Sequence, residues 1–215
     1  MIALNLWLSG ILIVLWSVSA AASEIMVGTF AEGELDGWIP KVFAGETRYR
    51  LVMDGDRRVL RADSQGTASG LYREITIGLE RTPYLNWSWR VADVLSNVDE
   101  RSKTGDDYPA RVYVVASDDR LFWRTRALVY VWSNNQPIGS SWDNAYTANA
   151  KVIAVRSGKP ATDTWFSEKR NVAADFQRLF GVDISHIDAV ALMTDTDDSG
   201  QQATAWYGDI YFSER

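Results

Sequence analysis

Two adjacent carboxylates, Asp106 and Asp107, stand just before Pro109 and a strand-like segment at 110–116 that carries Arg111. Cleavage of a glycosidic bond needs two carboxyl groups on opposite sides of the bond, with pKa values held apart by their surroundings. Neighbouring residues of an extended chain point in different directions, so Asp106 and Asp107 are poor partners for each other. We expect this pair to orient Arg111 or to accept hydrogen bonds from the hydroxyls of a ligand.

Nucleophilic catalysis has little support in the sequence, which has one histidine, His186, and no cysteine. Disulfides, zinc–thiolate sites and cysteine nucleophiles are excluded. A Ser-His-Asp triad would need His186, and the chain has no G-x-S-x-G turn to present a serine. We therefore assign no catalytic residue. A cross-strand carboxylate pair, and with it a carboxylate-dependent glycoside hydrolase or lyase, stays open as an alternative; its candidates are Asp106, Asp107, Glu168, Asp195, Asp197 and Asp209.

A short acidic stretch, Asp195-Thr196-Asp197-Asp198-Ser199-Gly200, begins like a calcium-binding loop, with oxygen-bearing side chains and a glycine at the sixth position. The twelfth position of an EF-hand is a bidentate glutamate, but here it is Trp206. The stretch is therefore not an EF-hand. A structural Ca²⁺ held by Asp195, Asp197 and Asp198 is one interpretation, and a solvated acidic turn between two strands is the other.

The elements that position these residues are mostly strands. The clearest alternation runs over 84–91, where Leu85, Trp87, Trp89 and Val91 share one face, opposite a face that contains Asn86, Ser88 and Arg90. Asp54-Gly55 predicts a hairpin between two further strands. One helix is expected at 172–180, capped by Asn171 and ended by Gly181. About ten strands and one short helix predict an all-β fold, an antiparallel β-sandwich of jelly-roll type.

The N-terminal segment 1–22 is almost wholly apolar and ends in Ser19-Ala20-Ala21-Ala22, which predicts a secretory signal peptide, with a retained membrane anchor as the alternative. We expect residues 23–215 to form a single β-sandwich domain in the periplasm or outside the cell, with no membrane span after signal cleavage. The formal net charge of −6 argues against a nucleic-acid partner. We expect a monomer with no cofactor, apart from the possible Ca²⁺.

A binding face follows if the strands at 84–91, 110–116 and 126–133 lie in one sheet. The polar sides of these strands would then present Arg90, Arg111, Tyr113, Tyr130 and Trp132 to solvent, with Asp106 and Asp107 at the entrance. Aromatic rings stack on the apolar faces of sugars, and arginines give fixed hydrogen-bond donors. The same residues would suit a structural cluster of ion pairs under a loop. A shift of one residue would reverse the side on which Tyr130 and Trp132 lie.

Several blocks of sequence resemble a bacterial secreted family catalogued as domain of unknown function 3047. The resemblance rests on Trp87-Ser88-Trp89-Arg90, Asp106-Asp107-Tyr108-Pro109-Ala110-Arg111-Val112-Tyr113, Tyr130-Val131-Trp132-Ser133, Arg170-Asn171-Val172 with Asp175 and Phe180-Gly181, and Met193-Thr194-Asp195-Thr196-Asp197. It implies no catalytic or binding residue. Phe30 with Leu35-Asp36-Gly37-Trp38 also resembles the first strand and turn of jelly-roll carbohydrate-binding modules.

The function that we expect is non-catalytic binding of a glycan or another cell-envelope ligand on a concave sheet face. Arg90 and Arg111 would donate hydrogen bonds, while Tyr113, Tyr130 and Trp132 would supply the stacking surface. The two alternatives are the carboxylate-dependent hydrolase or lyase and a structural envelope protein that binds no ligand.

Overall fold

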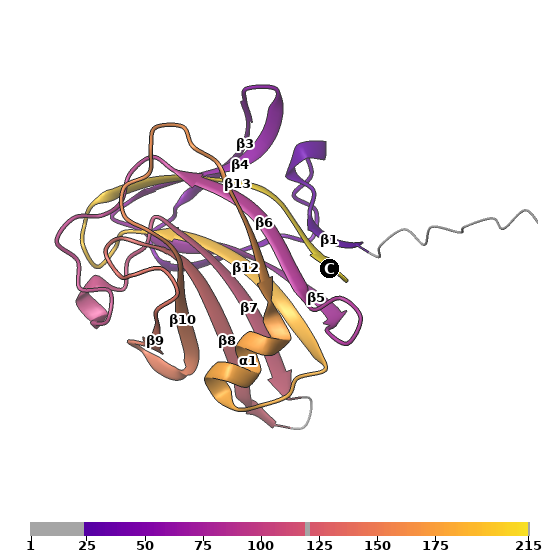
Figure 1. Ribbon diagram of the computed structural model, residues 1–215. Coiled ribbons are helices and arrows are strands. Elements are labelled where there is room, and N and C mark those ends of the chain that lie inside the picture. The colour runs from indigo at the N-terminus through magenta and orange to yellow at the C-terminus, as the bar shows by residue number, and fades with distance from the viewer. Residues whose placement is uncertain (1–23, 119–120, 215) are drawn as a thin grey trace, which may run out of the picture.

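Strands dominate the residues that the structure, a computed structural model, describes, namely 24–118 and 121–214. The expected signal peptide at 1–22 lies outside the described residues. The strands form two sheets that face each other, as Figure 1 shows. The fold is a β-sandwich of jelly-roll type, as the sequence predicted.

The first sheet, sheet A, has the strand order β11-β6-β13-β4-β3, and β1 also pairs with β13. Its members are β1 (Glu24–Gly28), β3 (Arg48–Asp54), β4 (Arg57–Gln65), β6 (Tyr84–Val91), β11 (Phe166–Asn171) and β13 (Gln202–Ser213). The predicted hairpin at Asp54-Gly55 is confirmed. It joins β3 to β4, with Asp54 opposite Arg57 and with Gly55 at a φ of 61°, a conformation that favours glycine.

The second sheet, sheet B, has the order β2-β5-β12-β7-β8-β10-β9. Its members are β2 (Ile39–Ala44), β5 (Ala68–Gly78), β7 (Ala110–Asp118), β8 (Leu121–Ser133), β9 (Ser141–Asn144), β10 (Thr147–Ser157) and β12 (His186–Asp195). The sequence did not predict β2 or β9. The pairing of β8 with β10 is parallel, which departs from the antiparallel pairing of the neighbouring strands.

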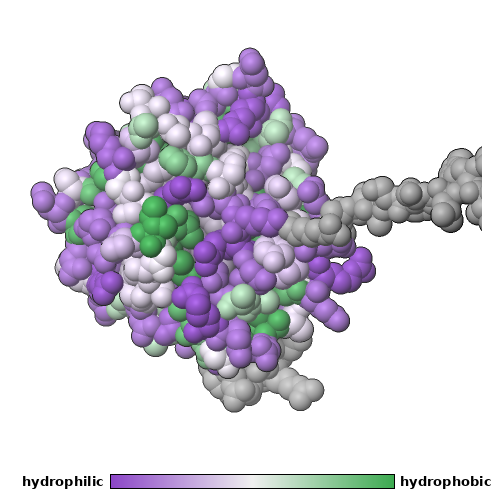
Figure 2. Space-filling model, in the orientation of Figure 1, coloured by the Kyte–Doolittle hydropathy of each residue, from purple (hydrophilic) through white to green (hydrophobic). Residues whose placement is uncertain are grey.

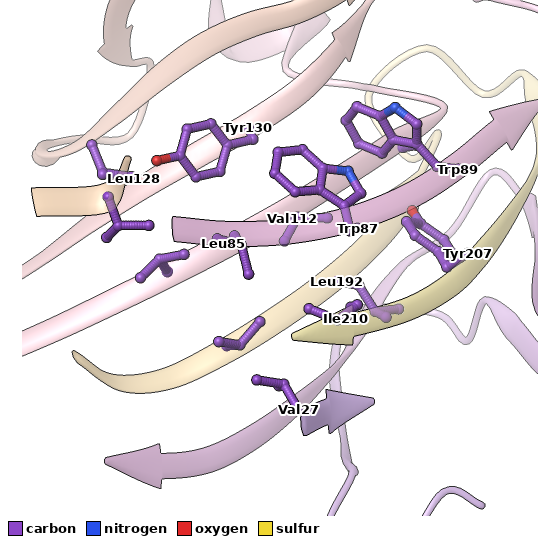
Figure 3. Close-up of a cluster of buried hydrophobic side chains, with 14 of the residues drawn as sticks. Val27, Leu85, Trp87, Trp89, Val112, Leu128, Tyr130, Leu192, Tyr207 and Ile210 are labelled. Atoms are coloured by element: carbon purple, nitrogen blue, oxygen red, sulfur yellow. The ribbon is translucent and has the colours of Figure 1, made fainter. Parts of the chain in front are cut away.

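The core lies between the inner faces of the two sheets. The alternation of β6 is confirmed, because Leu85, Trp87, Trp89 and Val91 are all buried in the main hydrophobic cluster. Figure 3 shows Trp87 and Trp89 in this cluster beside Tyr130 and Tyr207. The outside is different in character: Figure 2 shows a face on which hydrophilic residues predominate and hydrophobic residues form small separate groups.

The predicted helix is confirmed as α1 (Val172–Phe180). The side chain of Asn171 accepts a hydrogen bond from the backbone of Ala174 at 3.0 Å, and Gly181 ends the helix in the left-handed conformation with a φ of 67°. Val172 and Phe176 anchor the helix in the core. Two single 3-10 turns, η1 (Phe30–Glu32) and η2 (Lys103–Gly105), complete the described elements.

Candidate functional site

The two arginines that the sequence suggested as a ligand clamp lie on opposite outer faces of the sandwich. Arg90 is on β6 of sheet A, whereas Arg111 is on β7 of sheet B. The neighbours of Arg90 in the strand, Trp89 and Val91, face the core, and so do the neighbours of Arg111. Since side chains alternate along a strand, both arginines point outward from different sheets. The expectation that 84–91, 110–116 and 126–133 share a sheet is therefore wrong.

Tyr130 and Trp132 lie inside the sandwich, not on an outer face. The ring of Tyr130 is 5.4 Å from that of Trp87, and its hydroxyl donates to Asp175 at 3.0 Å. Figure 3 shows Tyr130 pointing into the cluster. Trp132 donates from Nε1 to the Gly158 carbonyl at 3.0 Å. The assumed register was off by one residue, so these two aromatics are core residues and cannot form a stacking surface.

Arg111 is the centre of a buried cluster of ion pairs. Only 3 % of Arg111 is exposed. Its Nε donates to Asp195 at 2.8 Å, and its other nitrogens contact the Asp195 carboxylate, the Asp106 carboxylate and the Asp106 carbonyl. The guanidinium also lies 4.6 Å from the centre of the Tyr108 ring. The structure therefore brings Asp106 and Arg111 together, as expected, but in an arrangement in which Arg111 joins a loop to sheet B.

Asp107 fixes the acidic loop that follows β12. It is fully buried and accepts hydrogen bonds from the backbone of Ser199 at 2.6 Å and of Asp198 at 3.3 Å. One carboxylate oxygen from each of Asp107, Asp197 and Asp198 lies within 4.8 Å of the others. Burial and the charge of Asp107 raise the pKa of Asp197 above its ordinary value.

The carboxylates that the structure groups differ in one residue from those of the predicted metal site. Asp195 is held by Arg111, so the three carboxylates that could share a cation are Asp107, Asp197 and Asp198. The pKa of Asp198 is raised by burial and by the charges of Asp197 and Asp107, and such mutual repulsion is what a bound Ca²⁺ would relieve. Whether an ion binds there stays a prediction.

Tyr113 lies on the outer face of sheet B beside an apolar depression. Its hydroxyl is 3.8 Å from the sulfur of Met193. The depression has a volume of about 360 Å³ and is lined mainly by apolar and aromatic side chains, which include Phe43, Tyr72 and Tyr113. It offers few hydrogen-bonding groups. The other half of this outer face is covered, because Tyr108 packs there on Val129 and Val131.

The outer face of sheet A has a different composition and contains the arrangement best suited to a polar ligand. Four residues, Arg50, Arg61, Trp206 and Arg90, stand directly opposite one another on the adjacent strands β3, β4, β13 and β6. We call them the arginine row. The guanidinium of Arg90 lies 3.8 Å from the centre of the Trp206 ring, and that of Arg61 lies 5.3 Å from it. Trp206 is half-buried, so part of its surface remains accessible.

Carboxylates balance the charge of the arginine row. Arg50 and Arg61 both bind Asp63, and Arg90 binds Asp54 at 2.9 Å and also contacts Asp163. Burial raises the pKa of Asp63, but hydrogen bonds from Arg61, Arg50 and Thr204 lower it more, so the net pKa is below its ordinary value. Arg90 is only 8 % exposed, and its Nε has no hydrogen-bond partner among the described residues.

Two depressions extend the row toward β11. One, of about 450 Å³, lies between the β3–β4 hairpin and Trp165 and includes Arg90 and Arg57. The other, of about 460 Å³, includes Arg57, Ser88, Ser167 and Lys169. Arg57 lines both, so the two depressions adjoin each other at this side chain. Its guanidinium is stacked 3.5 Å from the centre of the Trp165 ring.

Most of this face was missed from the sequence. Arg90 was identified, but Arg61, Trp206, Trp165 and Arg57 were not. The available signal was alternation: Ala205 and Tyr207 face the core, which places Trp206 on the outside. Trp206 lies between two arginines because β13 pairs with β4 and β6. This pairing joins distant parts of the chain and cannot be predicted from the alternation within one strand.

Comparison with known proteins identifies the family and the fold. A family described as "Protein of unknown function (DUF3047)" matches residues 36–211, so the chain belongs to that family. No curated protein matches the sequence. Among the described residues, no helix is long and apolar enough to cross a membrane.

Solved structures with a similar fold include carbohydrate-binding modules and endoglucanases. The family 30 carbohydrate-binding module of the cellulosomal cellulase Cel9D-Cel44B of Clostridium thermocellum has a TM-score of 0.52 and 12% identity, and the match covers 88% of this chain and 96% of that one. Endoglucanase Cel12A from Rhodothermus marinus has a TM-score of 0.45 and 9% identity, covering 89% and 99%. The CBM22-1 xylan-binding domain of Xyn10C from Paenibacillus barcinonensis has a TM-score of 0.42 and 10% identity, covering 92% and 99%. At these identities the first match supports the jelly-roll fold alone.

Proposed function

We propose that this member of the DUF3047 family is a non-catalytic module that binds a glycan on the outer face of sheet A. The observation that carries the proposal is the arginine row, in which a partly accessible tryptophan stands between Arg61 and Arg90 on a polar, pocketed sheet surface. The fold shared with the family 30 carbohydrate-binding module is consistent with this function.

The chemistry of the row suits a sugar. An indole ring offers a flat apolar surface on which the C–H face of a pyranose can lie, while guanidinium groups donate to ring hydroxyls in fixed directions. Arg61 and Arg90 are held in place by Asp63, Asp54 and Asp163, so little side-chain entropy remains to be lost on binding.

The carboxylates on this face favour binding over glycoside cleavage. A general acid for cleavage needs a raised pKa so that it is protonated near neutral pH. Asp63 has a lowered pKa because of its arginine partners, and Asp54 and Asp163 are both bound to Arg90. These carboxylates are therefore suited to holding arginines in position.

The proposal includes the compartment and the state of the protein. The apolar segment at 1–22 supports export to the periplasm or beyond, where polysaccharides are available as ligands, and the lack of cysteine is compatible with it. We propose a monomer that binds no nucleic acid, in keeping with the net charge of −6.

Substitution of Trp206 tests the binding face. A glycan array followed by titration calorimetry on the best ligand should show binding at least tenfold weaker in Trp206→Ala, a loss of about 1.4 kcal/mol. Phe43→Ala is the matched control, because Phe43 is an aromatic residue that is 66% exposed on sheet B. It should bind like the wild type. If Phe43→Ala abolishes binding while Trp206→Ala does not, the glycan binds to sheet B and the proposal is wrong. If no array member is bound, the protein is not a glycan-binding module.

A further inference from the structure

The depression bordered by β4, β6, β11 and β13 contains three cations outside the arginine row. Arg57, Arg58 and Lys169 all border this volume of about 460 Å³, together with the hydroxyls of Ser88 and Ser167. Ser88 and Ser167 stand opposite each other on β6 and β11. The next pair on the same outer side of sheet A is Asn86 and Lys169.

These three cations have no carboxylate partner. Within the described part of the chain, Arg57, Arg58 and Lys169 form no ion pair within 4.0 Å, whereas Arg50, Arg61 and Arg90 each form at least one. Arg57 is stacked on Trp165, and the Nζ of Lys169 lies 4.9 Å from the centre of the Tyr84 ring. Aromatic stacking orients a cation but does not neutralise it.

Two carboxylates border the depression, and one of them, Glu168, is neutralised by a cation outside it. Glu168 binds Arg156 and accepts from Trp89 Nε1 at 3.1 Å. Asp209 accepts from the backbone of Ala31 at 2.9 Å and so holds the η1 turn beside the depression. Three cations without an ion pair therefore border the depression with one carboxylate that no cation neutralises, Asp209, so the depression keeps a net positive charge in a protein whose overall charge is negative.

The backbone is shaped to make this space. The pairing of β13 with β6 is irregular between Tyr207 and Ile210, a bulge that contains Gly208 and Asp209. A Cβ on Gly208 would collide with the Oγ of Ser88 in its present position, so the glycine leaves room for this hydroxyl. Gly33 ends η1 with a φ of 87°, a conformation that favours glycine.

We propose that this depression is a subsite for an anionic substituent, a carboxylate or a sulfate, of the glycan that binds across the arginine row. The proposal rests on the proposed function and specifies its ligand class: an acidic polysaccharide. Arg57 presents a planar fork that can hold two oxyanion oxygens, Lys169 adds a point charge, and Ser88 and Ser167 donate hydroxyl hydrogen bonds. Arg57 lies beside both depressions and Arg90 lines the first, so the subsite adjoins the arginine row.

The electrostatic surroundings of Arg57 agree with this assignment. Burial and the neighbouring charge of Arg90 lower its pKa, while Asp54 and Asp209 act in the opposite direction without forming an ion pair. A bound anion would relieve the repulsion between Arg57 and Arg90.

Matched polysaccharides test the subsite. One pair is a polyuronate and its carboxyl-reduced counterpart, and the other is a sulfated polysaccharide and its desulfated form. The wild type should bind the charged member of at least one pair at least tenfold more tightly than the neutral member. The pair that shows the preference distinguishes a carboxylate from a sulfate ligand. In the double variant Arg57→Gln/Lys169→Gln this ratio should fall to about one.

Lys41→Gln provides the control, since it removes one exposed positive charge from sheet B. It should keep the full preference for the charged member. The subsite is refuted if both members of each pair bind equally well to the wild type, or if the preference persists in the double variant. It is also refuted if Lys41→Gln lowers the preference as much as the double variant does.

The two proposals fail in different ways. Equal binding of charged and neutral members that is still lost in Trp206→Ala removes the anionic subsite and leaves the glycan-binding face intact. Binding that does not depend on Trp206 refutes the proposed face, whatever the preference for charge. The absence of binding to any of the four polysaccharides refutes both.

Discussion

Replacement of Arg111 by methionine tests whether the strongest charged motif in the sequence is structural. Methionine keeps a similar unbranched shape but removes the guanidinium. Two carboxylates would then remain in the interior without a cation: Asp195, which is 1% exposed, and Asp106, which is 6% exposed. The change should destabilise the fold strongly, because an unpaired buried charge is costly.

The size of the effect follows from the burial. Removal of one partner of a buried ion pair typically costs about 3–5 kcal/mol. For a domain of 150–250 residues, each kcal/mol shifts the melting temperature by about 2–4 °C, so Arg111→Met should melt about 6–20 °C below the wild type. Arg90→Met should cost less, because its partner Asp163 is 77% exposed and can be solvated.

Thermal and urea unfolding followed by tryptophan fluorescence would measure both variants. The double variant Arg111→Met/Asp195→Leu should recover part of the loss, since replacing a whole buried pair by apolar residues is often neutral. A melting temperature of Arg111→Met within about 2 °C of the wild type would contradict the structural role of the cluster. If that stable variant also lost glycan binding, Arg111 would have to be a ligand-binding residue.

Two further effects concern stability alone. Burial raises the pKa of Glu100 above its ordinary value despite hydrogen bonds from Ser133 and Asn134, so the folded state holds a proton more tightly than the unfolded state. The contribution of Glu100 to the unfolding free energy is fully present below the unfolded pKa and is lost as the pH rises through the folded pKa. The fall in unfolding free energy above about pH 4.5 should therefore be smaller in Glu100→Gln than in the wild type. Equal pH profiles of the two proteins would contradict this. Gly105→Ala should lower the melting temperature by several degrees, because a Cβ there would collide with the backbone of Asp99, whereas Gly78→Ala, with open space around it, should not.

The parts of the fold that were predicted correctly depend on local patterns. The strand 84–91 has apolar residues on one side only, so its alternation indicates which side faces the core, and it placed Arg90 on the outside correctly. The helix 172–180 has its own cap in Asn171 and its own stop in Gly181. In both cases the information lies within about ten residues, where residue types and backbone preferences act directly.

The face of the strand 126–133 could not be predicted in this way. Its two sides are both apolar, with Leu128, Tyr130 and Trp132 on one and Val129 and Val131 on the other, and both sides are buried. Alternation therefore gives no preference between them. What decides the matter is that Tyr108, from the preceding loop, covers Val129 and Val131 from outside. That contact depends on how the loop folds back over the sheet.

The partition of strands between the sheets was the larger obstacle for the site. The strand 84–91 precedes 110–116 in the chain, but β6 pairs with β13 and β11, whereas β7 pairs with β12 and β8. In a jelly roll, strands that follow each other in sequence often cross to the other sheet. The arginine row forms only because β13, near the end of the chain, lies between β4 and β6.

Arg111 and Arg90 both point outward, but their nitrogens contact different groups, and this difference supports different roles. Arg111 has its nitrogens occupied by two nearly inaccessible carboxylates and a carbonyl, so a ligand would have to displace strong buried partners. Arg90 is almost as buried, but it retains an unpaired Nε, one partner exposed to solvent, and contact with the accessible ring of Trp206. A ligand binds most readily where donors are held in place by a partner that solvent already reaches. Binding should therefore depend on Arg90 and its neighbours on sheet A, and stability on Arg111.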